Sequence, residues 1–199
     1  IGQSLWIDDI TRDMLDSGTL AKYISEFSVT GLTSNPTIFD RAVTRSDKYD
    51  DEIRRLMKGG LKGEALFFEL ALQDLSRAAD LFLPVHEQTA TVDGWVSLEV
   101  SPLLAYDTKA TIEEAKRLYK KAGKPNLFIK IPGTKEGLPA IEEAIFSGVT
   151  VNVTLLFSAA QYTAVADAYV KGLERRVEAG LSPDVRSVAS VFISRWDKA

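Results

Sequence analysis

Lys130 is the residue of this sequence with the clearest potential for chemistry. It lies in a short apolar run, residues 127–131, which a Pro132-Gly133 pair closes. Such a run predicts a buried strand of a parallel sheet. Burial disfavours the charged form of a lysine, and a neutral amine is a nucleophile that forms a Schiff base with a carbonyl compound. The alternative is that Lys130 lies at the strand end and extends its amine into water.

Five other strand-like segments each carry polar side chains at the corresponding end. These side chains belong to Asp8, Asn35, Glu99, Asn152 with Thr154, and Ser190. In a parallel barrel the C-terminal ends of the strands meet on one side, so we expect this set to converge with Lys130. Inward positions of a barrel are normally branched aliphatic residues, and buried carboxylates are rare unless paired. The set therefore predicts an active site rather than a core.

Each of these residues also has a simpler interpretation. Asp8 and Asn35 could cap the helices that follow them. Glu99 could serve only as the ion-pair partner of Lys130. The hydroxyl and amide groups at positions 152, 154 and 190 could satisfy nearby backbone. Arg195, just after the sixth strand, suits a phosphate because a guanidinium binds phosphate through two hydrogen bonds; its alternative is a surface position on a helix.

The elements that must position these residues alternate regularly along the chain. Strands are expected at residues 4–8, 29–33, 94–100, 126–131, 148–154 and 185–191. Helices are expected at 9–16, 19–27, 62–83, 108–122, 135–146 and 158–179, with helical pieces in 36–58. Residues 84–93, which include the single histidine, His86, are expected to form a loop.

This alternation indicates an α/β fold with a parallel sheet and right-handed crossovers. A Rossmann sheet is disfavoured because the turn after the first strand, residues 8–11, has no GxGxxG pattern. A (β/α)8 TIM barrel fits better, although that fold usually takes about 250 residues. We therefore expect residues 1–199 to form one barrel domain that shows strands 1–6, lacks strands 7–8 and is truncated at both ends.

Composition narrows the possible partners. The net charge of −4 argues against nucleic acid and anionic membranes. No apolar run is long enough to span a bilayer, so we expect no membrane-spanning segment, and we expect no signal peptide. The absence of cysteine excludes disulfides and thiolate metal sites and fits a reducing cytoplasm. One histidine without cysteine argues against a zinc site, so we expect no metal and no direct role for His86.

Several motifs together resemble the transaldolase family, and the resemblance covers nearly the whole chain. The motifs are Leu5-Trp6-Ile7-Asp8-Asp9, Gly31-Leu32-Thr33-Ser34-Asn35-Pro36, Val96-Ser97-Leu98-Glu99, Ile129-Lys130-Ile131-Pro132-Gly133-Thr134 and Val151-Asn152-Val153-Thr154. The resemblance implies a class I aldolase-type barrel of the pentose phosphate pathway. Such an enzyme moves a dihydroxyacetone unit from a ketose phosphate, such as sedoheptulose 7-phosphate or fructose 6-phosphate, to an aldose phosphate, without a cofactor.

The resemblance also implies a role for each matched residue. Lys130 would form the Schiff base, and Asp8 would act as the acid and base at the substrate C4 hydroxyl. Glu99 and Thr154 would hold the catalytic water. The substrate contacts would come from Asn35, Asn152 and Ser190, with Arg195 on the phosphate.

Two other functions stay open at this point. One is an aldolase of the fructose-6-phosphate type, which releases free dihydroxyacetone. The other is an inactive barrel fragment that needs a partner segment, because the family places a second phosphate-binding arginine after the seventh strand, which we do not find. Sugar phosphates are the expected partners, and the protein could also form a homo-oligomer.

Overall fold

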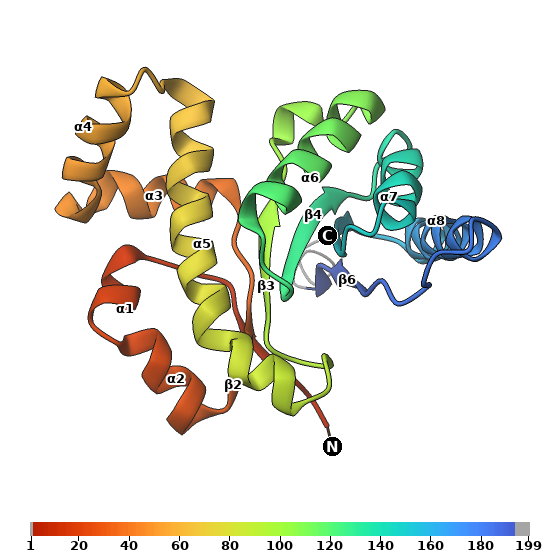
Figure 1. The fold of residues 1–199 in the computed structure, drawn as a ribbon, viewed down its shortest axis with the longest axis horizontal. Helices are drawn as coiled ribbons and strands as arrows, with labels where there is room; N and C mark the ends of the chain where they lie inside the picture. Colours follow the sequence, from red (N-terminus) through yellow and green to blue (C-terminus); the bar gives the residue numbers. More distant parts are fainter. Residues whose placement is uncertain (1, 194–199) are drawn as a thin grey trace. The chain divides into compact units, whose positions relative to one another are not determined.

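Six strands alternate with helices along residues 2–193, the part of the chain that this computed structural model describes (Figure 1). The strands follow one another in the sheet in sequence order. They are β1 (Leu5–Ile7), β2 (Val29–Leu32), β3 (Trp95–Glu99), β4 (Leu127–Pro132), β5 (Val151–Leu156) and β6 (Ser187–Val191). The predicted fold class is confirmed: this is a partial (β/α)8 barrel, and no seventh or eighth strand lies within residues 2–193.

The chain packs as two compact units. Unit 1 comprises Ile1–Leu98 with Lys124–Leu127, and unit 2 comprises Glu99–Gly123 with Phe128–Ala199. β1 pairs with β2 and β2 with β3 in unit 1, and β4 pairs with β5 and β5 with β6 in unit 2; all four pairs are parallel. Strands joined in parallel need long crossovers, which is why helices separate them in the sequence.

Unit 1 is built around one long helix, α5 (Gly63–Gln88). The other helices are α1 (Arg12–Asp16), α2 (Thr19–Phe27), α3 (Pro36–Arg45), the 3₁₀ turn η1 (Asp47–Tyr49) and α4 (Asp50–Lys58). α5 packs against α1, α2, α4 and β2 and contributes much of the buried apolar surface of the unit. The helical pieces expected in 36–58 are separated at Ser46, which is extended and caps η1.

A glycine lets an indole ring lie across the sheet in this unit. Trp6 in β1 pairs with Gly31 in β2. A Cβ atom at position 31 would clash with Cε2 of the Trp6 ring. No larger residue therefore fits at position 31, and the ring of Trp6 fills the space that a side chain would take.

Unit 2 packs three helices in succession, α6 (Thr108–Ala122) on α7 (Gly137–Phe146) and α7 on α8 (Ala159–Glu178), with the 3₁₀ turn η2 (Pro102–Leu104) before them. Arg175 on α8 bonds to Glu142 at 3.0 Å and to Glu143 at 2.8 Å, which joins α8 to α7. Every residue of β4 is buried, as its two-sided apolar sequence predicts. No residue of β6 is fully buried.

The predicted loop at residues 84–93 is wrong at its start. α5 continues through Pro84 to Gln88. Proline removes one backbone hydrogen bond from a helix, but Phe82 and His86 lie one turn apart and are both buried, which holds the last turn in place. Nδ1 of His86 lies 3.0 Å from the carbonyl of Asp93, and its ring meets Trp95 edge-on at 4.6 Å. His86 thus has a packing role in unit 1.

The helices of the described residues include none with the length and apolar character that crossing a bilayer requires.

Candidate active site

Lys130 lies buried in β4 of unit 2 and has a carboxylate beside its amine. Nζ is 3.1 Å from Oε2 of Glu99, the last residue of β3, and the two side chains are only 7% and 12% exposed. A backbone hydrogen bond joins the two chain segments beside this pair: the N–H of Val100 donates to the carbonyl of Lys130 at 3.1 Å. The amine therefore does not extend into water, and a proton acceptor lies within direct reach of it.

The neighbouring strands extend this contact into a row of polar groups. Asn152 in β5 is in register with Lys130 and is 1% exposed. Residues in register on adjacent parallel strands project from the same face of the sheet. The hydroxyl of Ser190 in β6 donates to Oδ1 of Asn152 at 2.8 Å. Glu99, Lys130, Asn152 and Ser190 thus lie side by side across β3 to β6, as the alternation in the sequence predicts.

Thr154 lies two residues beyond Asn152 on the same strand and is also buried. A β-bulge follows it, because the register between β5 and β6 shifts between Val153 and Leu156. Leu155 within this bulge has φ 60°, a left-handed conformation that costs energy for any residue except glycine. Bulges of this kind redirect side chains beside active sites. Residues 153–156 include no glycine or asparagine, so the sequence does not predict the bulge.

Two threonines that the sequence does not predict as site residues join the loops that follow β3 and β4. The hydroxyl of Thr134 donates to the carbonyl of Ala105 at 2.7 Å, and the hydroxyl of Thr108 donates to that of Glu136 at 2.6 Å. These loops leave the ends of the strands that carry Glu99 and Lys130. The two bonds connect them, and nothing in the spacing of the threonines distinguishes them from ordinary turn residues.

Asp8 and Asn35 belong to unit 1. Asp8 is exposed and directly follows β1. Asn35 caps α3, because its side-chain oxygen accepts a hydrogen bond from the N–H of Ile38 at 2.9 Å. Asn35 thus caps α3, and this bond uses only the side-chain oxygen of its amide. Arg195 lies outside the described residues.

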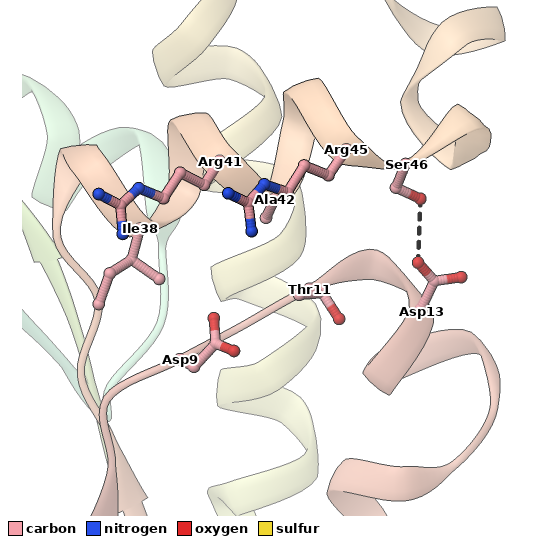
Figure 2. Close-up of a pocket in the computed structure, with 8 residues that line it drawn as sticks. All are labelled: Asp9, Thr11, Asp13, Ile38, Arg41, Ala42, Arg45 and Ser46. Atoms are coloured by element: carbon pink, nitrogen blue, oxygen red, sulfur yellow. Dashed lines mark hydrogen bonds between the residues drawn. The ribbon is translucent and has the colours of Figure 1, made fainter.

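The same unit contains a cavity of about 400 Å³ (Figure 2). It is lined by Asp9, Thr11, Asp13, Ile38, Arg41, Ala42, Arg45 and Ser46. One wall is the segment between β1 and α1, and the other is α3. None of the predicted site residues lines it.

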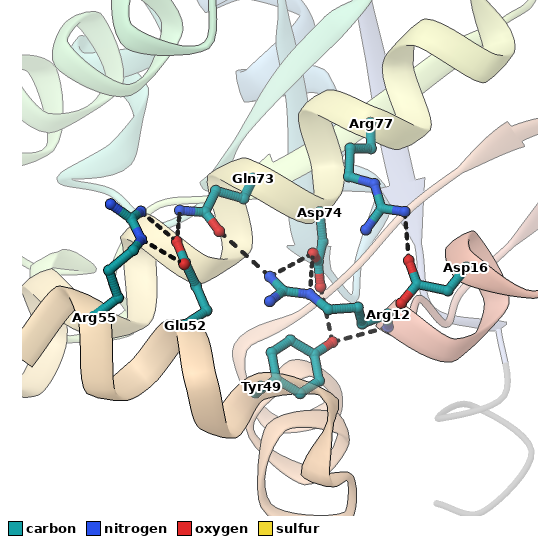
Figure 3. A network of polar contacts seen from close by, with 8 residues as sticks. All are labelled: Arg12, Asp16, Tyr49, Glu52, Arg55, Gln73, Asp74 and Arg77. Carbon is teal, nitrogen blue, oxygen red and sulfur yellow. Dashed lines mark hydrogen bonds and ion pairs between the residues drawn. The ribbon is translucent and has the colours of Figure 1, made fainter.

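A buried ion pair fixes the segment that follows Asp8 (Figure 3). Arg12 donates to Oδ1 of Asp74 from Nε at 2.9 Å and from an Nη at 2.8 Å. The hydroxyl of Tyr49 donates to Oδ2 of Asp74 at 2.8 Å and accepts from the N–H of Arg12 at 3.0 Å. Burial, and then the Asp74 carboxylate, raise the pKa of Tyr49 well above its ordinary value, so its hydroxyl remains a donor. The network ties the start of α1 to η1 and α5.

Chemically, the row in unit 2 combines a nucleophile, a base and hydrogen-bonding groups. An amine with an adjacent carboxylate can attack a carbonyl and give up its proton. An amide and two hydroxyls at the next positions can bind the hydroxyl groups of a substrate. No metal ion is required for this chemistry.

Comparison with known proteins identifies the same group of enzymes. Residues 5–199 match the family described as transaldolase/fructose-6-phosphate aldolase. A transaldolase of Thiobacillus denitrificans is 48% identical over the whole chain, which spans 56% of that protein. A transaldolase of Thermobifida fusca is 48% identical over 98% of the chain, and transaldolase 2 of Nostoc punctiforme is 45% identical over 98%. The chain covers 54% and 52% of these two, so it spans about half the length of the relatives it matches. The motifs, the strand order and these matches agree: the chain belongs to the transaldolase/fructose-6-phosphate aldolase family.

Proposed function

We propose that this protein is a transaldolase that acts through a Schiff base on Lys130. It would transfer a dihydroxyacetone unit from a ketose phosphate, sedoheptulose 7-phosphate or fructose 6-phosphate, to an aldose phosphate. The observation that carries the proposal is the buried amine of Lys130, 3.1 Å from the Glu99 carboxylate and in register with Asn152. Membership of the family and the names of the relatives support the reaction class.

The first step forms the imine. Glu99 takes a proton from the ammonium group of Lys130, and the neutral amine attacks the ketone carbon to give a carbinolamine. The carbinolamine then loses its hydroxyl group as water, which needs a proton donor, and the protonated Glu99 can supply that proton. Thr154 holds this water in the proposal, because it is the next buried hydroxyl along β5.

The second step breaks the bond between C3 and C4. The protonated imine withdraws the electron pair of that bond while Asp8 takes the proton of the C4 hydroxyl, so an aldose phosphate leaves and an enamine stays on Lys130. The enamine then attacks the aldehyde carbon of the acceptor, Asp8 returns the proton to the new hydroxyl, and hydrolysis of the imine releases the product. Asn35, Asn152 and Ser190 would bind substrate hydroxyls, and Arg195 the phosphate.

A borohydride trap tests the nucleophile. Sodium borohydride added with fructose 6-phosphate reduces the imine to a stable amine, and peptide mass spectrometry locates the adduct. We expect the adduct on Lys130 and none in Lys130→Ala, which should also be inactive. An adduct on another lysine would refute the assignment.

Lys116→Ala provides the matched control. Lys116 also lies in unit 2 and pairs with a glutamate, Glu143, at 2.8 Å, but its side chain is 39% exposed. Loss of this lysine should leave both the adduct and the activity intact. If Lys116→Ala loses activity as fully as Lys130→Ala does, Lys130 would be needed only for folding, as Lys116 is.

The aldolase alternative has specific support, because the family that matches the chain includes fructose-6-phosphate aldolases. The two activities differ in what receives the three-carbon unit. A transaldolase holds the enamine until an aldose phosphate arrives, whereas an aldolase releases free dihydroxyacetone. Incubation with fructose 6-phosphate alone, followed by assay of dihydroxyacetone, separates them.

We also propose the cytoplasm as the site of action, since a chain without cysteine suits a reducing compartment. Sugar phosphates are the proposed partners. A homo-oligomer remains a prediction that size-exclusion chromatography with light scattering can test.

A further inference from the structure

The cavity in unit 1 contains charged groups that the proposed reaction does not use. It lies between the segment from Asp9 to Asp13 and the side of α3 that carries Arg41 and Arg45 (Figure 2). Its volume of about 400 Å³ falls within the range of small-molecule sites.

Three of its charged side chains have no partner among residues 2–193: no hydrogen bond or ion pair involves those of Asp9, Arg41 or Arg45. The other polar groups of the cavity are engaged. Thr11 caps α1, and the hydroxyl of Ser46 donates to Asp13 at 2.9 Å.

The spacing of the two arginines suits one anion. Arg41 and Arg45 are four residues apart on α3, so they lie on the same face of the helix, and both side chains border the cavity. Guanidinium groups bind phosphate oxygens through paired, charge-assisted hydrogen bonds. In a concave site such charges attract an anion more strongly than on a flat surface.

The remaining lining indicates what the anion is attached to. The Asp9 carboxylate faces the arginine side across the cavity and can only accept hydrogen bonds when it is ionised, so it suits hydroxyl groups. Ile38 and Ala42 give apolar surface for C–H groups. A bare phosphate would leave Asp9 unused, and a phosphate that carries hydroxyl groups would use both sides.

We propose that this cavity is a binding site for a sugar phosphate, with the phosphate on Arg41 and Arg45 and the hydroxyl groups on Asp9. The identity of the ligand class rests on the proposed function, while the anion site rests on the arginines alone. The site is additional in its residues, because none of the residues that line it takes part in the proposed reaction.

Sorbitol 6-phosphate is a suitable probe, because it has the hydroxyl groups and the phosphate but no carbonyl group to react with a lysine. Titration of the ¹⁵N-labelled intact protein should give saturable shifts at the backbone amides of Asp9 to Thr11 and of Ile38 to Ser46. Inorganic phosphate should shift the α3 amides with weaker affinity. Failure of the Lys130 trap would leave these shifts unchanged, so the two proposals fail separately.

Three variants decide the assignment. Arg41→Gln with Arg45→Gln should weaken binding of both probes at this site by roughly tenfold for each guanidinium removed. Asp9→Asn should keep phosphate binding and lose most of the preference for sorbitol 6-phosphate. Arg54→Gln, on α4 and already paired with Asp50 and Asp51, is the control and should change nothing.

Two results would overturn the proposal. The first is the absence of saturable shifts at the α3 amides with either probe. The second is an unchanged affinity in the arginine double variant, checked by its thermal melting to be folded.

Discussion

At the scale of single residues, Lys130 and Glu99 each offset the cost of burying the other's charge. A lone charge inside a protein costs several kcal/mol, and an opposite charge within hydrogen-bond distance offsets much of that cost. Both side chains lie largely out of water, so removal of either takes a close opposite charge away from the other. The same closeness that stabilises the pair gives the amine an acceptor for its proton.

Glu99→Gln tests this dependence. The amide cannot take a proton from Lys130, so we expect kcat to fall by about 10²–10⁴-fold. Borohydride trapping should slow in parallel, because imine formation is the affected step. Glu143→Gln, which removes a partner of the half-exposed Lys116, is the control and should keep full activity. Normal trapping in Glu99→Gln would show that another group acts as the base.

Asp8→Ala tests the second carboxylate. Asp8 is exposed at the end of β1 and serves cleavage rather than imine formation in the proposed reaction. We expect Lys130 to be trapped at a normal rate while release of the aldose phosphate slows by about 10²–10⁴-fold. Stopped-flow assay of that product separates the steps. Cleavage at the normal rate would remove Asp8 from the mechanism.

At the scale of elements, unit 1 depends on polar contacts between its helices. The Arg12–Asp74–Tyr49 network joins α1, α5 and η1, and the ring of Tyr49 also lies under the Arg12 guanidinium at 4.4 Å. Phe39 of α3 meets Tyr49 edge-on at 6.0 Å and Phe67 of α5 at 5.4 Å. These contacts place the segment after β1 against α5.

Asp74→Ala should therefore be severe. It leaves Arg12 charged, nearly buried and without its carboxylate, which costs about 3–5 kcal/mol in the free energy of unfolding. Asp80→Ala is the matched control on the same helix: Asp80 pairs with Lys124 at 2.6 Å but is 59% exposed, and its loss should cost less than about 1 kcal/mol. Urea unfolding measures both, and similar losses would contradict the role of burial.

Acid should weaken the link between α4 and α5. The hydrogen bonds from Arg55 are the largest factor that lowers the pKa of Glu52 to about 2, and Gln73 of α5 donates to the same carboxylate. A carboxyl group with a lowered folded pKa stabilises the protein above its unfolded value near 4.5, and this contribution is lost as the pH falls toward 2.

Glu52→Gln should remove this contribution, which we expect to be roughly 1 kcal/mol for a pair at the surface. The variant should be less stable than the wild type at pH 7, and the difference should shrink between pH 4.5 and 2. Chemical unfolding at several pH values measures it. A constant difference across this range would show that Glu52 acts through packing alone.

At the scale of the whole molecule, the strands differ strongly in burial. All six residues of β4 are buried and five of the six in β5 are, whereas β6 has none. In β6, Val188 and Val191 are 37% and 40% exposed. Phe192, which directly follows β6, stacks its ring on that of Phe157 at 5.8 Å, and Phe157 is itself 44% exposed. Buried strands open only with much of the fold, and exposed ones open locally.

Hydrogen exchange measured by mass spectrometry should follow this order. Amides of β4 and β5 should exchange slowest, and those of β6 faster by at least about tenfold, which corresponds to about 1.4 kcal/mol in opening free energy. The measurement needs the intact protein under native conditions. Equal protection of β6 and β4 would show that β6 is covered in solution.

The order of the elements could be read from the sequence because it depends on local patterns. Periodicity alone predicts Thr19–Phe27 and Thr108–Ala122, which are the observed bounds of α2 and α6. Alternation along β3, β4 and β5 likewise predicts that Glu99, Lys130 and Asn152 share a face, because successive side chains in a strand point to opposite sides.

The family motifs indicate Schiff-base chemistry on this face. They could be recognised because they depend only on residue type and spacing. Long-range packing is different. The residues near Pro84 do not predict that α5 continues to Gln88, because this last turn depends on the burial of His86 against Trp95. The partners of Arg12 lie 37 and 62 residues away.

The sequence by itself determined the strand–helix alternation, the polar face of the strands and the family, because each follows from local pattern. Only the tertiary structure decided that Glu99 touches the amine of Lys130, that Asp74 holds Arg12, and that Arg41 and Arg45 border a cavity with Asp9. Such contacts join residues far apart in the chain, and their distances depend on how whole elements pack rather than on the order of neighbouring residues.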